Sequence, residues 1–224
     1  GEKITAMISV PEFNATDYLI MVTKHGIIKK TLLSEYEYQR KGGKKALNLD
    51  EGDELAYVMH TRGECDIIIA TREACAVRFT ERNVRPMGRT ARGVRGITVR
   101  GDDYVTGVAI VEEGKSLITV TENGYGKRLE FDNFSQHHRG TGGQLYYKDK
   151  NNKGEVAAVL SILEGEDIFA ITVKGQIIRI SSDQISKQGR AASGIRLVRV
   201  SDDDKIIAAS RAPASEEEKT EEGN

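Results

Sequence analysis

The sequence has no tryptophan, only 8 tyrosines and 5 phenylalanines, 3 prolines and 2 cysteines among 224 residues. Two cysteines do not support a disulfide-stabilised scaffold, and Cys65 and Cys75 with His60 lack the spacing of a zinc site. No run of 18 or more apolar residues occurs, which argues against a transmembrane helix. Residues 1–10 lack the order of a signal peptide. We therefore expect a reduced cytosolic protein without a membrane partner.

Glycine is abundant, with 23 residues, and this favours many short strands joined by tight turns over long helices. A unit of about fifty residues occurs four times. Each copy begins with an apolar segment that ends in threonine, at residues 18–23, 66–71, 116–121 and 167–172. Repeats of this length are typical of solenoids and propellers.

Two further features recur in the same place of every repeat. Three residues after each threonine comes a turn residue, and four residues later comes a cation. The turn residues are Gly26, Ala74, Gly124 and Gly175, and the cations are Lys30, Arg78, Arg128 and Arg179. The pattern predicts a β-hairpin at the start of each repeat, with Asn123-Gly124 as its plainest turn signal.

The rest of each repeat predicts two more strands after a basic, Gly-rich loop. The loops cover residues 38–45, 82–96, 136–143 and 186–194. Short strands are expected at 46–49, 97–99, 144–147 and 195–200, and closing strands at 54–58, 104–111, 156–163 and 205–210. An acidic turn separates the two strands except in the third repeat, where residues 148–155 replace it. Four strands per repeat predict an all-β fold of blades.

Residues 1–10 match the closing strand of a repeat, as a comparison with residues 52–58 shows. We therefore expect a fragment of a longer polypeptide that begins with the closing strand of a preceding blade. Residues 1–211 would form one domain of about four full blades, with repeats at about 17–58, 65–111, 115–163 and 166–210.

The net charge of −1 hides an uneven distribution. Residues 212–224 contain five glutamates and one lysine, a net charge of −4, which leaves +3 on the preceding 211 residues. This acidic tail has almost no apolar residues, so we expect it to be disordered. It is either a solubilising segment or an internal competitor for the ligand of the basic body.

Glycine beside lysine and arginine allows backbone amides and cationic side chains to approach a polyanion together. Cations at regular intervals suit a bent DNA duplex, whose phosphates release counterions when neutralised. The candidate DNA-binding residues are Lys30, Arg40, Lys41, Lys44, Lys45, Arg78, Arg85, Arg89, Arg92, Arg95, Lys127, Arg128, Arg139, Arg179, Lys187 and Arg190.

Catalytic and cofactor sites are not indicated. The four histidines occupy unrelated positions of the repeats, and we expect them to be exposed and solvated. Gly124-Tyr125-Gly126 lacks the pattern and context of a nucleotide-binding loop. We expect no catalytic residue, no metal and no cofactor in this chain. A propeller that serves as a protein-interaction module remains an alternative, although the sequence offers few aromatic or apolar anchors for it.

Several segments resemble the C-terminal domain of the DNA gyrase A subunit. These are Thr121-Glu122-Asn123-Gly124-Tyr125-Gly126-Lys127-Arg128, Val84-Arg85-Pro86-Met87-Gly88-Arg89 and Gly93-Val94-Arg95-Gly96-Ile97. The resemblance covers nearly all of residues 1–210. It implies a β-pinwheel, six-bladed when complete, that wraps double-stranded DNA around a basic rim and so supports ATP-dependent negative supercoiling by the holoenzyme. The related domain of the topoisomerase IV A subunit is an alternative.

The resemblance also implies partners and a cellular location, and one segment differs from the family's motif. Its partners are the remainder of the A subunit and the gyrase B subunit, which hold the catalytic tyrosine and use ATP and Mg²⁺ outside this chain. It implies a bacterial, cytoplasmic, nucleoid-associated protein, and we expect the fragment to be monomeric. Gln39-Arg40-Lys41-Gly42-Gly43-Lys44-Lys45 is similar to the family's Gln-Arg-Arg-Gly-Gly-Lys-Gly box, with Lys41 and Lys45 as the differences.

Overall fold

The computed structural model describes residues 4–10, 12–38, 41–148 and 150–212. Their strands form four antiparallel sheets, three with four strands and one with three. The expected all-β fold of about four blades is confirmed. Helix in the described part of the chain is limited to α1 (Lys150–Lys153) and four short 3-10 turns, η1 (Leu33–Tyr36), η2 (Glu81–Asn83), η3 (Phe131–Asn133) and η4 (Ser182–Gln184). Within these ranges, no helix is long and apolar enough to cross a membrane.

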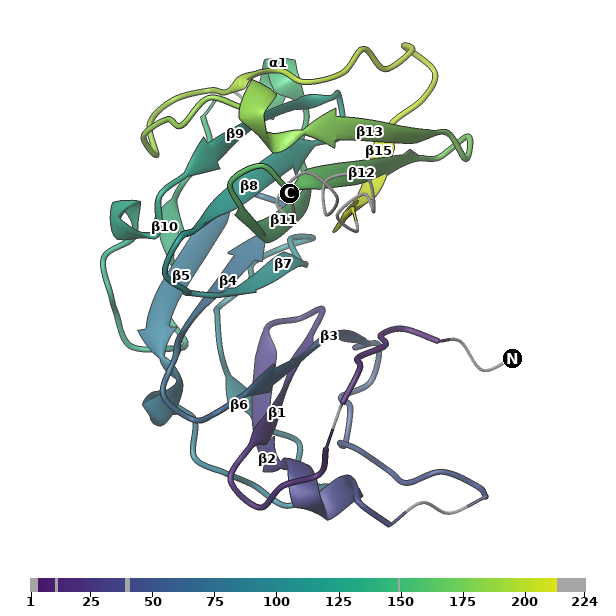
Figure 1. Ribbon diagram of the computed structural model, residues 1–224, viewed down its shortest axis with the longest axis vertical. Helices are drawn as coiled ribbons and strands as arrows, with labels where there is room; N and C mark the ends of the chain where they lie inside the picture. The colour runs from purple at the N-terminus through teal and green to yellow at the C-terminus, as the bar shows by residue number, and fades with distance from the viewer. Residues whose placement is uncertain (1–3, 11, 39–40, 149, 213–224) are drawn as a thin grey trace, which may run out of the picture. The chain divides into compact units, whose positions relative to one another are not determined.

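Each sheet is built on the hairpin that the repeat pattern predicts. The four hairpins are β1 (Tyr18–Thr23) with β2 (Ile27–Leu32), β4 (Asp66–Thr71) with β5 (Cys75–Thr80), β8 (Lys115–Thr121) with β9 (Tyr125–Leu129), and β12 (Asp167–Thr172) with β13 (Ile177–Ser181). The turn residues all have positive φ, including Ala74 at 64°. Figure 1 shows each pair side by side.

The repeated threonine closes the hairpin turn. The hydroxyl Oγ1 of Thr23 accepts a hydrogen bond from the N–H of Ile27 at 3.1 Å, and Thr121 accepts one from Tyr125 at the same distance. Thr71 and Thr172 make the equivalent bonds. A hydroxyl that satisfies a backbone donor in the turn explains why threonine ends the first strand of every repeat.

The third strand of each sheet pairs with the first strand of the hairpin, as expected from the closing segments. These strands are β3 (Leu55–Thr61), β7 (Val105–Ile110), β11 (Val156–Leu163) and β15 (Ile206–Arg211). The acidic turns before β3, β7 and β15 cap the hairpin turns, because carboxylates of Asp53, Asp103 and Asp204 accept the N–H groups of His25, Glu73 and Lys174. In the third repeat α1 takes this place.

The fourth strand of a sheet comes from the next repeat along the chain. β6 (Val94–Arg95) pairs with β2, β10 (Gln144–Leu145) lies beside β5, and β14 (Ile195–Arg196) pairs with β9. No strand forms at residues 46–49 or 97–99, so the prediction of short strands there is wrong, and the expected strands at 144–147 and 195–200 are limited to β10 and β14. This strand exchange links consecutive repeats.

A glycine with positive φ precedes each exchanged strand, and it is required for close contact. A Cβ on Gly93 would lie 2.6 Å from the carbonyl oxygen of Ile28, and one on Gly194 would lie 2.6 Å from that of Gly126. Since both contacts are with backbone, a side chain at these positions would separate the repeats.

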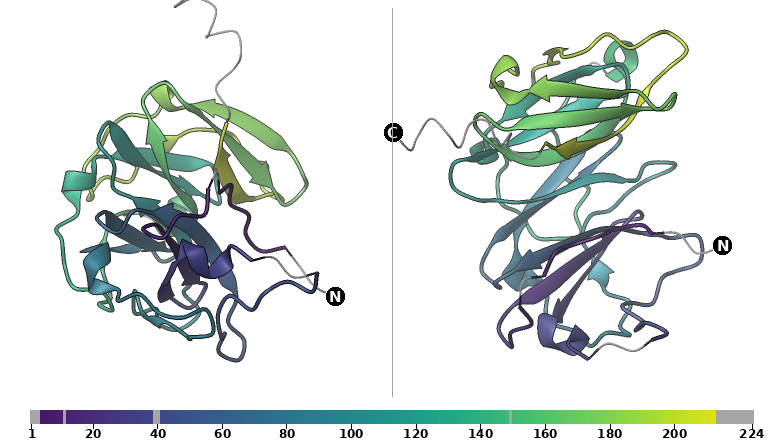
Figure 2. Two further views of the ribbon diagram at one scale, coloured as in Figure 1. Left: turned by 60° about the horizontal axis from the view of Figure 1, so that its bottom comes forward. Right: turned by 45° about the vertical axis from the view of Figure 1, so that its right-hand side comes forward.

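The chain divides into two compact units. One contains the described residues of 4–111 and 134–144, and the other those of 112–133 and 145–212. Residues 134–144 belong with the first unit because their loop packs on its second sheet, where the N–H of His137 donates to the carbonyl of Arg78 at 2.8 Å. In the second unit, β15 lies along β12 (Figures 1 and 2).

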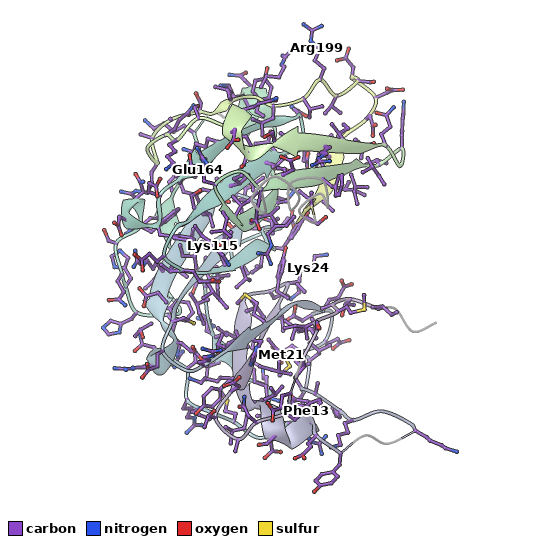
Figure 3. The ribbon with its side chains drawn as sticks, viewed as in Figure 1. Phe13, Met21, Lys24, Lys115, Glu164 and Arg199 are labelled. Carbon is purple, nitrogen blue, oxygen red and sulfur yellow. The ribbon has the colours of Figure 1, made fainter. Side chains whose placement is uncertain are left out.

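Each unit has its own apolar core. Ile20, Ile28, Ile67 and Phe79 lie in the core of the first unit and are fully buried. The core of the second unit contains four equally buried residues, Ile118, Val120, Ile168 and Ile185. A smaller cluster in the first unit surrounds Met21, which Figure 3 labels on β1.

The expected strand at residues 1–10 is not formed in its described part, residues 4–10. Ile4 and Met7 are 90% and 92% exposed there. Strands are stable only when their backbone groups are paired with neighbouring strands, and no described strand pairs with this segment.

Candidate nucleic-acid interface

The four phased cations each lie beside an acidic side chain of this chain. Arg78 and Arg179 bind Asp66 and Asp167, which begin the first strand of the same hairpin. Arg128 lies 3.7 Å from Glu164, and Lys30 lies 3.0 Å from Glu81. Of the four, Arg179 is the most exposed, with 53% of its side chain accessible. The phased row expected to meet DNA is therefore engaged within the protein.

Lys30 is the most enclosed of these cations. Its ammonium contacts Glu81 and lies 4.2 Å above the Tyr18 aromatic ring, and Glu81 also accepts hydrogen bonds from the Thr61 hydroxyl at 2.6 Å and the Cys65 thiol. Burial raises the pKa of Glu81, but these hydrogen bonds and the Lys30 charge outweigh it and lower the pKa overall. Because Lys30 and Glu81 come from consecutive repeats, the pair fastens one sheet to the next.

Lys127, another predicted DNA contact, is completely buried. Its ammonium donates to the carbonyl oxygens of Gly189, Arg190 and Ala192 at 2.8, 2.9 and 2.7 Å. Lys29 has the same place in the first repeat and binds the carbonyls of Ala46 and Arg89. Burial lowers the pKa of both ammonium groups to about 8. These two lysines hold the backbone of the Gly-rich loops.

In the second and third repeats, an arginine near the middle of the loop joins it to the loop of the preceding repeat. Arg139 donates from Nη1 to the carbonyl of Arg95 at 3.0 Å and from Nε to that of Asn83 at 2.9 Å. Arg89 donates in the same way to the carbonyl of Lys45 at 3.0 Å. Arg190, the equivalent residue of the fourth repeat, is half-buried. Loop-to-loop bonding leaves fewer guanidinium N–H donors of Arg89 and Arg139 available to a ligand.

The remaining predicted DNA contacts differ in their exposure and in whether their charged groups have a partner. Lys41, Lys45, Arg85 and Arg95 are exposed, and their charged groups have no partner among the described residues. Lys44 is half-buried and lies 5.9 Å from the Tyr38 aromatic ring. Arg40 lies outside the described residues.

Arg92 and Lys187 are exposed but paired. Arg92 makes a two-point contact with the carboxylate of Asp50. Lys187 lies 2.9 Å from Glu130 and 3.7 Å from Glu164, and the hydrogen bond and charge of Glu130 raise its pKa. Glu164, labelled in Figure 3, thus serves both Lys187 and Arg128.

A second set of cations recurs at one position of the loops. Two residues after the positive-φ glycine of each loop come Lys45, Arg95, Leu145 and Arg196. The three cations are all exposed. Arg196 was not among the predicted contacts, although the spacing from Gly194 matches that of Arg95 from Gly93. This glycine-to-cation spacing can be read from the sequence. The prediction instead aligned the repeats on their first strands, and that alignment selected Lys30, Arg78, Arg128 and Arg179.

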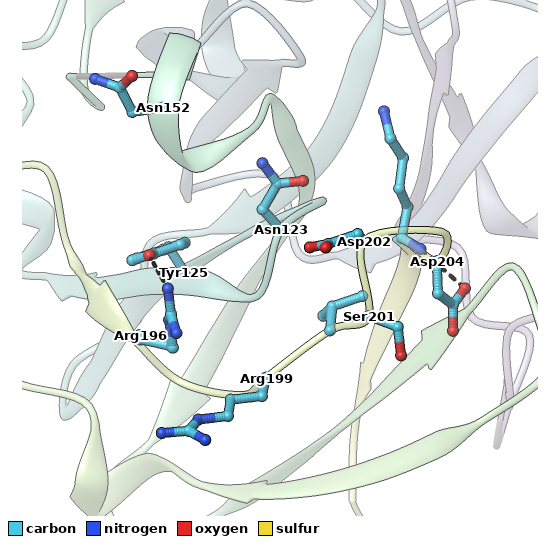
Figure 4. A pocket seen from close by; sticks show the side chains of 10 residues that line it. Asn123, Tyr125, Asn152, Arg196, Arg199, Ser201, Asp202 and Asp204 are labelled. Carbon is cyan, nitrogen blue, oxygen red and sulfur yellow. Dashed lines mark hydrogen bonds between the residues drawn. The ribbon is translucent and has the colours of Figure 1, made fainter.

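Arg196 borders a polar hollow of about 440 Å³ in the second unit (Figure 4). Its guanidinium lies 5.1 Å from the Tyr125 ring and donates to the Tyr125 hydroxyl, while the Lys153 ammonium lies 5.2 Å from the same ring. Arg199 also lines the hollow and projects outward (Figure 3). Asp202 and Asp204 line the same hollow.

His60 and the two cysteines are engaged within the fold, whereas His25, His137 and His138 are exposed, as expected. His60, expected to be solvated, instead lies 2.6 Å from Asp17, a partner 43 residues away that sequence spacing did not reveal. Cys65 and Cys75 are free thiols, and burial raises the pKa of both. Among the described residues, no three His, Cys, Asp or Glu side chains converge into a metal site.

Strand-exchanged four-stranded sheets joined by basic Gly-rich loops define a protein of the β-propeller class. The family model described as "DNA gyrase C-terminal domain, beta-propeller" matches residues 17–62, 66–112, 115–162 and 166–213. The chain belongs to this family.

Individual relatives agree with that assignment. The DNA gyrase A subunit of Staphylococcus aureus (strain NCTC 8325 / PS 47) is 37% identical over 99% of this chain and 25% of its own length. That of Aminobacterium colombiense is 37% identical over 94% of this chain and 26% of its own length. The chain therefore spans about a quarter of these relatives.

Two solved structures have the same fold. A DNA gyrase A C-terminal domain superposes with a TM-score of 0.81 at 26% identity, over 90% of this chain and 68% of that one. The C-terminal domain of a DNA topoisomerase IV gives a TM-score of 0.85 at 24% identity, over 92% of this chain and 65% of that one.

Proposed function

We propose that this chain binds double-stranded DNA without sequence preference through the exposed cations of its Gly-rich loops, and bends the duplex. The observation that carries the proposal is an exposed cation two residues after the loop glycine in three of the four repeats, at Lys45, Arg95 and Arg196. Phosphate contacts by such side chains carry no sequence information, so affinity would depend on charge and DNA shape.

The anchoring of the loops supports this role. The buried ammonium groups of Lys29 and Lys127 bind loop carbonyls. Arg89 and Arg139 join consecutive loops. A loop that is already ordered loses less conformational entropy when it binds. Fixed cations on the first, second and fourth repeats can therefore repay the several kcal/mol that bending a short duplex costs.

Within a whole protein, we propose that the chain is the DNA-wrapping part of a gyrase A subunit. It would act in the bacterial cytoplasm with the remainder of that polypeptide and a gyrase B subunit during ATP-dependent supercoiling. The active-site tyrosine, ATP and Mg²⁺ would lie outside this chain. Gyrase is favoured over topoisomerase IV because the relatives that match at 37% identity are gyrase A subunits.

The salt dependence of DNA binding tests the proposal. Each phosphate contact contributes about 0.9 to the slope of log affinity against log salt concentration. We expect Arg95→Gln and Arg196→Gln each to lower that slope by about 0.9 on a duplex of about 30 base pairs. Arg62→Gln is the matched control, since Arg62 is exposed and unpaired among the described residues but lies outside the loops. Equal slopes for all three variants would refute the assignment of these contacts.

A further inference from the structure

A polar hollow recurs beside three of the hairpin turns, where a repeat meets the following one. The first, of about 220 Å³, is lined by His25 of the β1–β2 turn and by Arg95 of the next loop. The second, of about 730 Å³, is lined by Glu73 and Gly143 of the corresponding turn and loop. The third is the hollow beside Arg196. The same elements therefore form all three hollows, with different side chains.

The first two hollows contain carboxylates of this chain. In the first, Asp50 accepts a two-point contact from the guanidinium of Arg92. The second is lined by Asp102 and Asp103 together with Arg100. A guanidinium binds a carboxylate and a phosphate with the same two-point geometry. The first hollow thus shows that an oxyanion can be held at such a junction.

The third repeat has no carboxylate at the position that caps the other hairpin turns. Asp53, Asp103 and Asp204 each precede the residue whose carbonyl accepts the first N–H of the turn, and the residue at this position in the third repeat is Gly154. Asn123 has the place of the turn residues that donate to those carboxylates. Neither its N–H nor its carboxamide is bonded to a described residue. The third hollow is therefore lined by donors without an internal acceptor.

The cations of the third hollow are only partly neutralised. Lys205 pairs with Glu122 at 2.9 Å, but Arg196 donates to the uncharged hydroxyl of Tyr125. Arg199 is exposed, and its guanidinium has no partner among the described residues. Two guanidinium charges are therefore available to an anion in this hollow.

The other polar groups of the third hollow have different effects on an anion. The hydroxyl of Ser201 is a further donor without a partner among the described residues. The carboxylate of Asp204 already accepts two backbone N–H groups, at 3.1 and 2.9 Å. Asp202 is exposed and unpaired within the described part of the chain, so it opposes an anion. The free cations still outnumber this one free carboxylate.

We propose that this third hollow binds a phosphate group, held by the guanidinium of Arg199, the carboxamide of Asn123 and the hydroxyl of Ser201, with Arg196 beside them. Figure 4 shows these side chains around the hollow. The phosphate comes either from the DNA backbone, in which case the inference rests on the proposed function, or from a free phosphate compound. Both offer the same oxyanion to these donors.

The site is ordered before a ligand arrives. Lys153 of α1 donates to the carbonyls of Ser193 and Gly194, both at 3.1 Å, and so holds the backbone that leads to Arg196. The ring of Tyr125 lies 5.2 Å from the Lys153 ammonium and 5.1 Å from the Arg196 guanidinium. A guanidinium that is already positioned loses less conformational entropy on binding.

Titration calorimetry of the full chain with inorganic tripolyphosphate at low salt tests the site. We expect one saturable site with a Kd below about 1 mM. Arg199→Gln removes the unpaired guanidinium and Asn123→Asp replaces an amide donor with a negative charge, so each should weaken binding about tenfold. Asp202→Asn should strengthen binding, because it removes the opposing carboxylate. Arg211→Gln is the matched control, since Arg211 is an exposed arginine of β15 that does not line the hollow.

The salt dependence of binding to a duplex of about 30 base pairs distinguishes the two sources of phosphate. If DNA supplies the group, Arg199→Gln should lower the slope of log affinity against log salt concentration by about 0.9. An unchanged slope beside weakened tripolyphosphate binding would assign the site to a free phosphate compound. Failure of all DNA binding would refute the proposed function and leave the tripolyphosphate result standing.

Circular dichroism establishes that each variant is folded. The proposal would be overturned if Arg199→Gln and Asn123→Asp left both the tripolyphosphate affinity and the DNA slope at their wild-type values. Absence of saturable tripolyphosphate binding together with an unchanged DNA slope would overturn it as well.

Discussion

Lys127→Met removes the ammonium that holds the loop of the fourth repeat while keeping a side chain of similar length. The ammonium makes three hydrogen bonds to loop carbonyls, of 2.7 to 2.9 Å. A hydrogen bond to a charged group contributes about 1.5–3 kcal/mol. Desolvation of the ammonium and access of water to the freed carbonyls offset much of this sum. We therefore expect the free energy of unfolding to fall by about 2–3 kcal/mol, and Tm by about 4–12 °C.

Thermal unfolding and hydrogen exchange measure the two consequences of this variant. Amides of residues 187–194 should lose protection, because the loop is no longer held. Lys205→Met is the control, since Lys205 is 59% exposed and pairs with Glu122 at 2.9 Å. Its effect should stay within about 0.5 kcal/mol. A Lys127→Met protein as stable as this control would refute the anchoring role.

The buried Lys127 gives the free energy of unfolding a pH dependence of defined sign. Burial lowers the pKa of Lys127 from 10.5 to about 8. Between these values the unfolded chain binds more protons than the folded one, so the free energy of unfolding rises with pH. The stabilisation that arises from the lowered pKa of Lys127 is fully present above pH 10.5 and is lost as the pH falls through about 8. The stability difference between wild type and Lys127→Met should therefore widen from pH 8 to 10.5, and a constant difference would contradict it.

Two further substitutions and one deletion give contrasting expectations. Glu81→Gln leaves the buried Lys30 ammonium without its carboxylate and should cost about 3–5 kcal/mol in urea denaturation, with partial recovery in the Lys30→Met/Glu81→Gln double variant. Gly124→Ala should cost about 1–3 kcal/mol more than Gly175→Ala, because both have positive φ but only the first meets a backbone carbonyl. Deleting residues 213–224 should tighten DNA binding at low salt, since it removes a net charge of −4 and spares the buried Ala212; unchanged affinity would refute competition by the tail.

The hairpins could be predicted because their signals are local. Threonine, turn residue and apolar strand lie within about a dozen residues, and the expected first strands at 18–23, 66–71 and 167–172 match β1, β4 and β12. The exchange of the fourth strand could not be predicted in this way. β6 pairs with β2 from the preceding repeat, and nothing in the spacing of one repeat indicates a partner so far away.

The roles of individual cations were harder to predict than their positions. Lys30 and Arg78 recur at the expected spacing, but the sequence does not show that Glu81 and Asp66 neutralise them. Lys127 lies in a basic segment and suggests an exposed contact, yet its ammonium points into the protein. Periodicity alone does not distinguish a structural ion pair from a ligand contact, because both need a fixed place in every repeat.

Ligation of nicked circular DNA with increasing amounts of this chain tests the central claim most directly. If the loop cations bind and bend the duplex, the topoisomer distribution should shift in one direction, and the shift should shrink at higher salt as phosphate contacts weaken. Binding without any shift at saturating protein would contradict bending of the duplex. Absence of both binding and shift at low salt would contradict the proposed DNA interface itself.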